Sequence, residues 1–151
     1  MVALNLLVGF LIVALLVASL IAPDWVMRGL GVSTAPNSPP PLLGLRLIMV
    51  VGILATPLTH VALTRLRDIV GMVSAGDPFV VENAVRLQQI AWAVLGLELL
   101  HLAVGVIRAI ASLDLHWSVS PTPWLSVLLL FVLARVFRQG ALMREELEGT
   151  V

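Results

Sequence analysis

The sequence has no cysteine and no lysine, and few charged residues of any kind. The absence of cysteine excludes disulfides, thiolate metal sites and cysteine nucleophiles. All nine basic residues are arginine and they balance nine carboxylates, so the formal net charge is zero. Without a bulk positive field, direct binding to nucleic acid is not expected.

Apolar side chains, in contrast, make up most of the chain. Of its 151 residues, 60% are hydrophobic and only 12% are charged, and the mean hydropathy is +1.06. Soluble domains are about half apolar and about a quarter charged, so this composition predicts a protein whose solvent is the lipid bilayer. A membrane-spanning helix needs about 20 apolar residues. The chain therefore has room for four spans with short connections and for no separate soluble domain.

Four apolar segments meet this requirement, and we predict spans at residues 4–22, 45–66, 88–112 and 124–138. The first segment does not read as a signal peptide, because no Lys or Arg precedes it and residues 20–22 form a poor cleavage site. Five prolines and three glycines in residues 23–44 predict a mostly irregular loop. A second connection is expected at residues 68–77.

The third span is expected to belong to a longer helix that runs from Pro78 to Ser112. Asp77 is a good N-cap, Pro78 suits the first helical position, and Glu82 lies near the positive end of the helix dipole. About three turns would then precede the apolar part, which begins at Ile90. The fourth span is likewise expected to continue as a polar helix.

The distribution of arginine predicts the orientation of the chain. Four spans place both termini on one side of the membrane, and the arginines expected on that side outnumber those opposite by six to three (Arg65, Arg67, Arg86, Arg135, Arg138 and Arg144 against Arg28, Arg46 and Arg108). The positive-inside rule therefore places both termini in the cytoplasm. The expected fold is an all-α, integral membrane four-helix bundle whose third and fourth helices extend into the cytoplasm.

Four ionisable side chains fall inside the predicted spans: Glu98, His101, His60 and Arg135. A charge at the centre of a bilayer costs several kcal/mol, so these groups need partners. Counting from the outer boundary at about 1.5 Å per residue puts Glu98, Arg135 and His60 near one depth, with His101 slightly above. We predict a buried polar cluster in which Glu98 pairs with Arg135, since Arg can make two bonds to one carboxylate.

Three interpretations of this cluster stay open. The polar groups can fix the register of the helices, form a proton or ion path, or hold a haem between His60 and His101, for which two isolated histidines are weak evidence. The sequence contains no metal-ligand spacing, phosphate-binding glycine loop, nucleophile elbow or acid/base carboxylate pair. We therefore expect no metal, no cofactor and no enzymatic activity.

Two stretches resemble a known bacterial family. The sequence GDPF at residues 76–79, followed by ENAVRL at 82–87, and the tail VFRQGAL at 136–142, with two glutamates and a terminal Thr-Val, resemble the family called domain of unknown function 2975. One departure is Gly149 before Thr150, where the family more usually has Leu. The resemblance implies a four-span bacterial inner-membrane protein of no established activity, often encoded beside a small helix-turn-helix regulator.

Both matching stretches lie on the predicted cytoplasmic extensions. The first hypothesis is therefore a non-enzymatic regulatory or scaffolding protein that binds such a regulator through the candidate surface formed by Glu82, Asn83, Arg86, Arg138 and Glu145. A small ion- or proton-coupled transporter that uses the polar cluster is one alternative. An accessory subunit bound to other membrane subunits is another. A capped helix start that packs against the tail would explain the same stretches without a partner.

Overall fold

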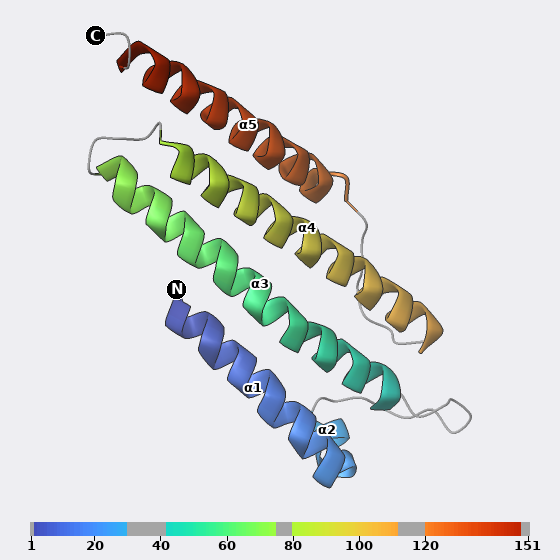
Figure 1. Cartoon of the computed structure of the whole chain (residues 1–151). Helices are drawn as coiled ribbons and strands as arrows, with labels where there is room; N and C mark the ends of the chain where they lie inside the picture. Colours follow the sequence, from blue (N-terminus) through green and yellow to red (C-terminus); the bar gives the residue numbers. More distant parts are fainter. Residues whose placement is uncertain (1, 30–41, 75–79, 112–119, 149–151) are drawn as a thin grey trace. The chain divides into compact units, whose positions relative to one another are not determined.

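The computed structural model describes residues 2–29, 42–74, 80–111 and 120–148, and this part of the chain is all-α (Figure 1). Its helices are α1 (Val2–Ile21), α2 (Pro23–Gly29), α3 (Leu42–Ser74), α4 (Val81–Ile110) and α5 (Thr122–Glu148). Four of them, α1, α3, α4 and α5, are long and apolar enough to cross a membrane. The protein is therefore a multi-pass membrane protein, as its composition predicts.

Three of the long helices are longer than a bilayer requires. α3 has 33 residues, α4 has 30 and α5 has 27, whereas about 20 residues cross the hydrocarbon core. The lengths of α4 and α5 agree with the prediction. Residues 68–74, in contrast, continue α3 and do not form the predicted connection. This stretch has no proline, and its one glycine, Gly71, costs only about 1 kcal/mol in a helix.

A second difference lies directly after α1. Residues 23–29 form α2, although their proline and glycine content predicts a loop. Pro23 takes the first helical position, Asp24 lies in the first turn and Arg28 in the last, which are the preferences of the helix dipole. Arg28 Nε also donates a hydrogen bond to the Asp24 carbonyl at 3.1 Å. Val26 is buried, so α2 gains stability from packing as well.

The beginning of α4 also differs from the prediction. The helix starts at Val81 and not at Pro78, and the predicted cap at Asp77 and Pro78 lies outside the described residues. Glu82 does occupy the first turn. The backbone N–H of Asn83 donates to the Val80 carbonyl at 3.0 Å, so the first turn is closed by a local bond.

The chain divides into two compact units, and both α3 and α4 contribute to each of them. Unit 1 contains Met1–Pro57 and Leu99–Val119, and unit 2 contains Leu58–Glu98 and Ser120–Val151. Unit 1 therefore holds α1, α2, the first half of α3 and the second half of α4. Unit 2 holds the remaining halves of α3 and α4 together with α5.

In unit 1, α1 contacts α3 through small and polar residues. A Cβ atom on Gly9 would lie 2.6 Å from Thr56 Cγ2, so the two helices approach closely at this point. Asn5 Nδ2 donates to the Thr56 carbonyl at 3.0 Å, and Arg46 donates to the backbone carbonyl and the hydroxyl of Ser19. Because lipid removes the hydrophobic drive between helices, close packing and such interhelical bonds hold them together.

In unit 2, α4 is the central helix. On one side a Cβ atom on Gly96 would lie 2.9 Å from Leu58 Cδ1 of α3, which shows another close approach. On the other side Trp92 meets Phe131 of α5 edge to face, with ring centroids 5.2 Å apart. This aromatic contact fixes which residues of α4 and α5 lie opposite one another.

Candidate functional site

The candidate site is the polar end of unit 2, where α3 ends and α4 begins. The first turns of α4 are flanked by two grooves. The one on the side of α5, which we call the α4–α5 groove, has a volume of about 370 Å³. Its lining combines polar and apolar side chains (Gln88, Arg135, Arg138 and Gln139 with Ala84, Val85, Phe131, Ala134 and Leu142).

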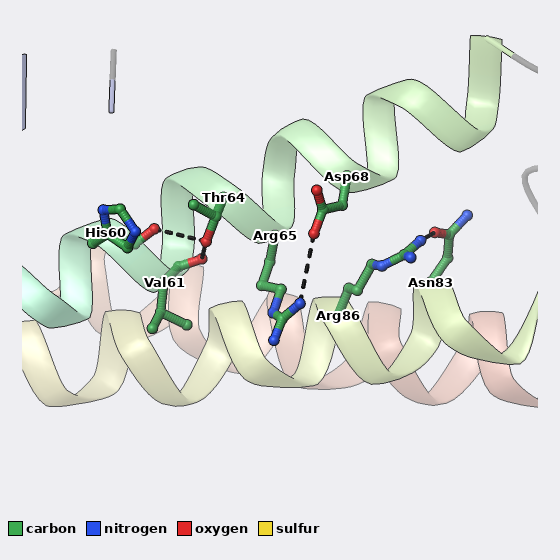
Figure 2. Close-up of polar contacts among 7 residues, drawn as sticks. All are labelled: His60, Val61, Thr64, Arg65, Asp68, Asn83 and Arg86. Atoms are coloured by element: carbon green, nitrogen blue, oxygen red, sulfur yellow. Dashed lines mark hydrogen bonds and ion pairs between the residues drawn. The ribbon is translucent and has the colours of Figure 1, made fainter. Parts of the chain in front are cut away.

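The second groove, the α3–α4 groove, has a volume of about 310 Å³. Arg65 of α3 lines it together with residues from the first turns of α4 (Val81, Glu82, Val85, Arg86 and Gln89). Figure 2 shows Arg65 reaching from α3 toward α4, with its Nη1 3.5 Å from the Asp68 carboxylate. Arg86 Nη1 donates to Asn83 Oδ1 at 2.9 Å (Figure 2). Both arginines are therefore oriented by a neighbouring side chain.

Asn83 is the main correction to the predicted partner surface. Its side chain is 0% exposed, so it cannot contact a partner. The prediction that Asn83 belongs to the partner surface is therefore wrong. Asn83 supports the surface from below, because it accepts the hydrogen bond that orients Arg86. The other predicted members do reach the surface: Glu82, Arg138 and Glu145 are exposed and Arg86 is half-buried.

The structure does not bring Glu98 and Arg135 together. Since Phe131 lies against Trp92 and the two helices run in opposite directions, Arg135 lies near Gln88, with which it lines the α4–α5 groove. Glu98 is ten residues further along α4, or about 15 Å at 1.5 Å per residue. The depth count fails because it takes the outer ends of α4 and α5 as level, whereas their packing sets a different register.

The two histidines of the predicted cluster belong to different units. His60 lies in unit 2 and is half-buried, and its Nδ1 atom is buried without a hydrogen-bond partner. Its backbone carbonyl accepts a bond from Thr64 Oγ1 at 2.9 Å (Figure 2). His101 belongs to unit 1, where it is exposed. Within the described ranges, no group of three or more His, Cys, Asp or Glu side chains could hold a metal ion.

A family model described as a protein of unknown function, DUF2975, matches residues 1–151. The chain belongs to this family. The match extends over all four spans and thereby confirms the resemblance that the two polar stretches indicate. Comparisons with curated proteins and with solved structures find no match.

Sequence reasoning gave no specific role to several polar residues that matter in this DUF2975 protein. Gln88 and Gln139 line the α4–α5 groove, and both lie where their helix changes from apolar to polar. Asn5 joins α1 to α3, and it is the one amide side chain in α1. An isolated amide in an apolar helix, or at the end of one, is therefore the signal that could have identified them, because lipid offers it no partner.

Proposed function

We propose that this DUF2975 protein is a non-enzymatic scaffold of the bacterial inner membrane that binds a cytoplasmic regulator protein at the polar end of unit 2. The observation that carries the proposal is the α3–α4 groove, whose charged side chains come from two helices. Arg65 and Arg86 are each held by a neighbour. Side chains that are already oriented lose less conformational entropy on binding, which favours a specific contact.

The expected partner is a segment that offers carboxylates to Arg65 and Arg86 and a basic group to the exposed Glu82. A helix-turn-helix regulator is the candidate, since the family resemblance implies that such proteins are often encoded beside family members. Such a partner would match the three charged side chains of the α3–α4 groove, Arg65, Glu82 and Arg86. Complementary charges raise specificity and association rate more than affinity. Binding is then expected to weaken as ionic strength rises.

Binding of this regulator is expected to depend on the α3–α4 groove and not on the exposed surface beside it. The charge reversal Glu82→Arg, and separately Arg65→Gln, should weaken capture of the regulator by the detergent-solubilised full-length protein by about tenfold, as expected for the loss of a charged hydrogen bond. Both changes should alter stability little, because exposed ion pairs contribute about 0–1 kcal/mol.

The matched control is Arg67→Gln, which removes an exposed arginine from the same end of α3 outside the groove lining. It should leave binding unchanged. Normal capture by Glu82→Arg and Arg65→Gln, together with loss in Arg138→Gln or Glu145→Gln, would instead assign binding to α5. Normal capture by all of these variants would contradict a partner at this end of the protein.

The proposal also requires both termini and the polar ends of α3, α4 and α5 to face the cytoplasm. Because the chain has no cysteine, single cysteines can report on orientation. Ser38→Cys is expected to react with a membrane-impermeant maleimide in intact spheroplasts, and Glu145→Cys only after lysis. The arginine distribution is the physical reason. Labelling of Glu145→Cys in intact spheroplasts would reverse the orientation and remove the cytoplasmic partner from reach.

The accessory-subunit alternative gains nothing specific from the exposed apolar face of α1. Phe10 is 70% exposed and Ile21 is 80% exposed. Lipid covers such a face as well as a protein partner does, because in the bilayer the hydrophobic effect does not favour contact with a helix over contact with lipid tails. The transporter alternative rests on Glu98 and His60, and Arg135 no longer adds a paired charge to them. We therefore keep the scaffold as the proposed function.

A further inference from the structure

We infer that the α4–α5 groove binds the phosphate of an anionic phospholipid headgroup. The inference concerns the α5 side of α4 and is independent of the regulator proposed for the α3 side. The groove brings together two arginines and two glutamines, Arg135, Arg138, Gln88 and Gln139, beside an apolar wall that includes Phe131 and Ala134.

The charge of the groove calls for an anion. Arg135 and Arg138 are three residues apart on α5, so their side chains lie on one face of the helix. Both are exposed, and within residues 2–29, 42–74, 80–111 and 120–148 no carboxylate pairs with either of them. Two guanidinium groups on one face repel each other unless an anion lies between them. The planar guanidinium makes paired hydrogen bonds to phosphate oxygens, and the two glutamine amides can add donors.

The position of the groove along the helices indicates that this anion belongs to a lipid. On α4 the groove includes Gln88, two residues before the apolar run that begins at Ile90, and on α5 it includes Arg138, directly after Phe137. Both helices thus change from apolar to polar at the groove. A change of this kind on two neighbouring helices marks the boundary between the hydrocarbon core and the headgroup region, within reach of lipid phosphates.

The length of α5 strengthens this assignment. From Trp124 to Arg138 the helix rises about 21 Å at 1.5 Å per residue, which is less than the hydrocarbon thickness of about 30 Å. Arg135 lies one turn deeper still. These side chains must extend toward the headgroups or draw the headgroups inward. A lipid phosphate seated between them satisfies both arginines at their own depth.

The apolar wall of the α4–α5 groove favours a lipid over a small soluble anion. Phe131 is fixed by its edge contact with Trp92, and Ala134 is buried beside it. A groove of about 370 Å³ exceeds what a phosphate ion fills, and the glycerol and the first acyl carbons of a lipid would cover the remaining apolar surface. Inorganic phosphate would leave this surface in contact with water, so we expect it to bind weakly.

The inference is tested by counting the lipids bound to the full-length protein by native mass spectrometry after exposure to an equimolar mixture of phosphatidylglycerol and phosphatidylcholine. The wild type should retain phosphatidylglycerol in preference, by about tenfold or more, the ratio expected for charged hydrogen bonds. The double variant Arg135→Gln/Arg138→Gln should lose this preference. Equal retention of both lipids by the wild type would overturn the inference.

Matched variants exclude a general charge effect. Arg67→Gln/Arg144→Gln removes the same charge from outside the groove lining and should keep the preference; a loss equal to that of the groove variant would overturn the inference. Arg135→Lys/Arg138→Lys keeps the charge but not the fork of donors, and should show an intermediate preference while the protein stays folded. An unchanged lipid preference in both Arg135→Gln/Arg138→Gln and Arg135→Lys/Arg138→Lys would also overturn the inference.

Competition between inorganic phosphate and phosphatidylglycerol shows whether the bound anion is a soluble ion or a lipid headgroup. Inorganic phosphate at millimolar concentration should not displace phosphatidylglycerol; displacement would show a soluble-anion site and overturn the lipid assignment. Glu82→Arg, which changes the α3–α4 groove, should keep the lipid preference even if it loses the regulator. The two proposals can therefore fail separately. Loss of the regulator in Arg135→Gln/Arg138→Gln with unchanged lipid preference would assign this groove to a protein and overturn the inference.

Discussion

Replacing Gly9 with leucine is expected to lower the free energy of unfolding by about 2–3 kcal/mol, at the upper end of the usual cost of overpacking. Even a methyl group at this position would have its carbon 2.6 Å from Thr56 Cγ2, a distance that non-bonded carbons do not adopt. The leucine side chain would have to push α1 away from α3. The interhelical bond from Asn5 to the Thr56 carbonyl would then lengthen or break as well.

Thr56 cannot easily turn aside to make room. Its hydroxyl donates to the Gly52 carbonyl at 3.1 Å, which holds the side chain in one rotamer. A second close approach occurs next to it, where a Cβ on Gly52 would lie 3.3 Å from Ile12 Cδ1. The helices are therefore in close contact over at least two turns, and a local shift at Gly9 is transmitted along the contact.

The stability of purified Gly9→Leu in detergent, followed by circular dichroism during thermal or denaturant unfolding, checks this prediction. Gly71→Leu is the matched control, because nothing lies within 4 Å of a Cβ at Gly71 and a better helix former there should add about 0.5–1 kcal/mol. Gly9→Ala/Thr56→Ala should stay much closer to wild-type stability than Gly9→Leu, because it removes the two Thr56 atoms that lie closest to the added Cβ. Wild-type stability of Gly9→Leu would mean that α1 does not pack on α3 in this way.

Replacing Asn83 with alanine is expected to cost about 1.5–3 kcal/mol, the usual value of a hydrogen bond to a charged group. The Asn83 side chain is fully buried, and its Oδ1 accepts the 2.9 Å bond from Arg86. The substitution leaves a small cavity and deprives a half-buried guanidinium of its acceptor. Glu82→Ala, one residue earlier and exposed, should change stability by no more than about 0.5 kcal/mol.

A double-mutant cycle isolates the pair. If the Arg86 bond carries most of the effect, Asn83→Ala/Arg86→Met should cost clearly less than the sum of the two single changes, because residues in contact are coupled. Unfolding in detergent is again the measurement. Additive losses would show that Asn83 acts through contacts other than its bond to Arg86, and a larger cost for Glu82→Ala than for Asn83→Ala would contradict the assignment of Asn83 to the interior.

The exposed and buried positions of the site show where sequence reasoning succeeds. The exposure of Glu82, Arg138 and Glu145 can be predicted from the local sequence pattern, because charged residues on a polar helix end face water. Asn83 belongs to the same stretch and has the same polar character, yet it faces the interior. An amide is short and neutral enough to be buried when it finds a partner, and the partner, Arg86, becomes evident only once the helix has formed.

Composition and apolar run length alone determine that this chain lives in a membrane and crosses it with four long helices, because hydropathy and helix length are local properties of the sequence. Which residues lie opposite one another depends on contacts between helices, such as Trp92 on Phe131 and Gly9 on Thr56. The contact of Trp92 with Phe131 separates Arg135 from Glu98 and places it beside Gln88. Only the tertiary structure decides this, because one helix can slide past another by several residues without any change in its own pattern.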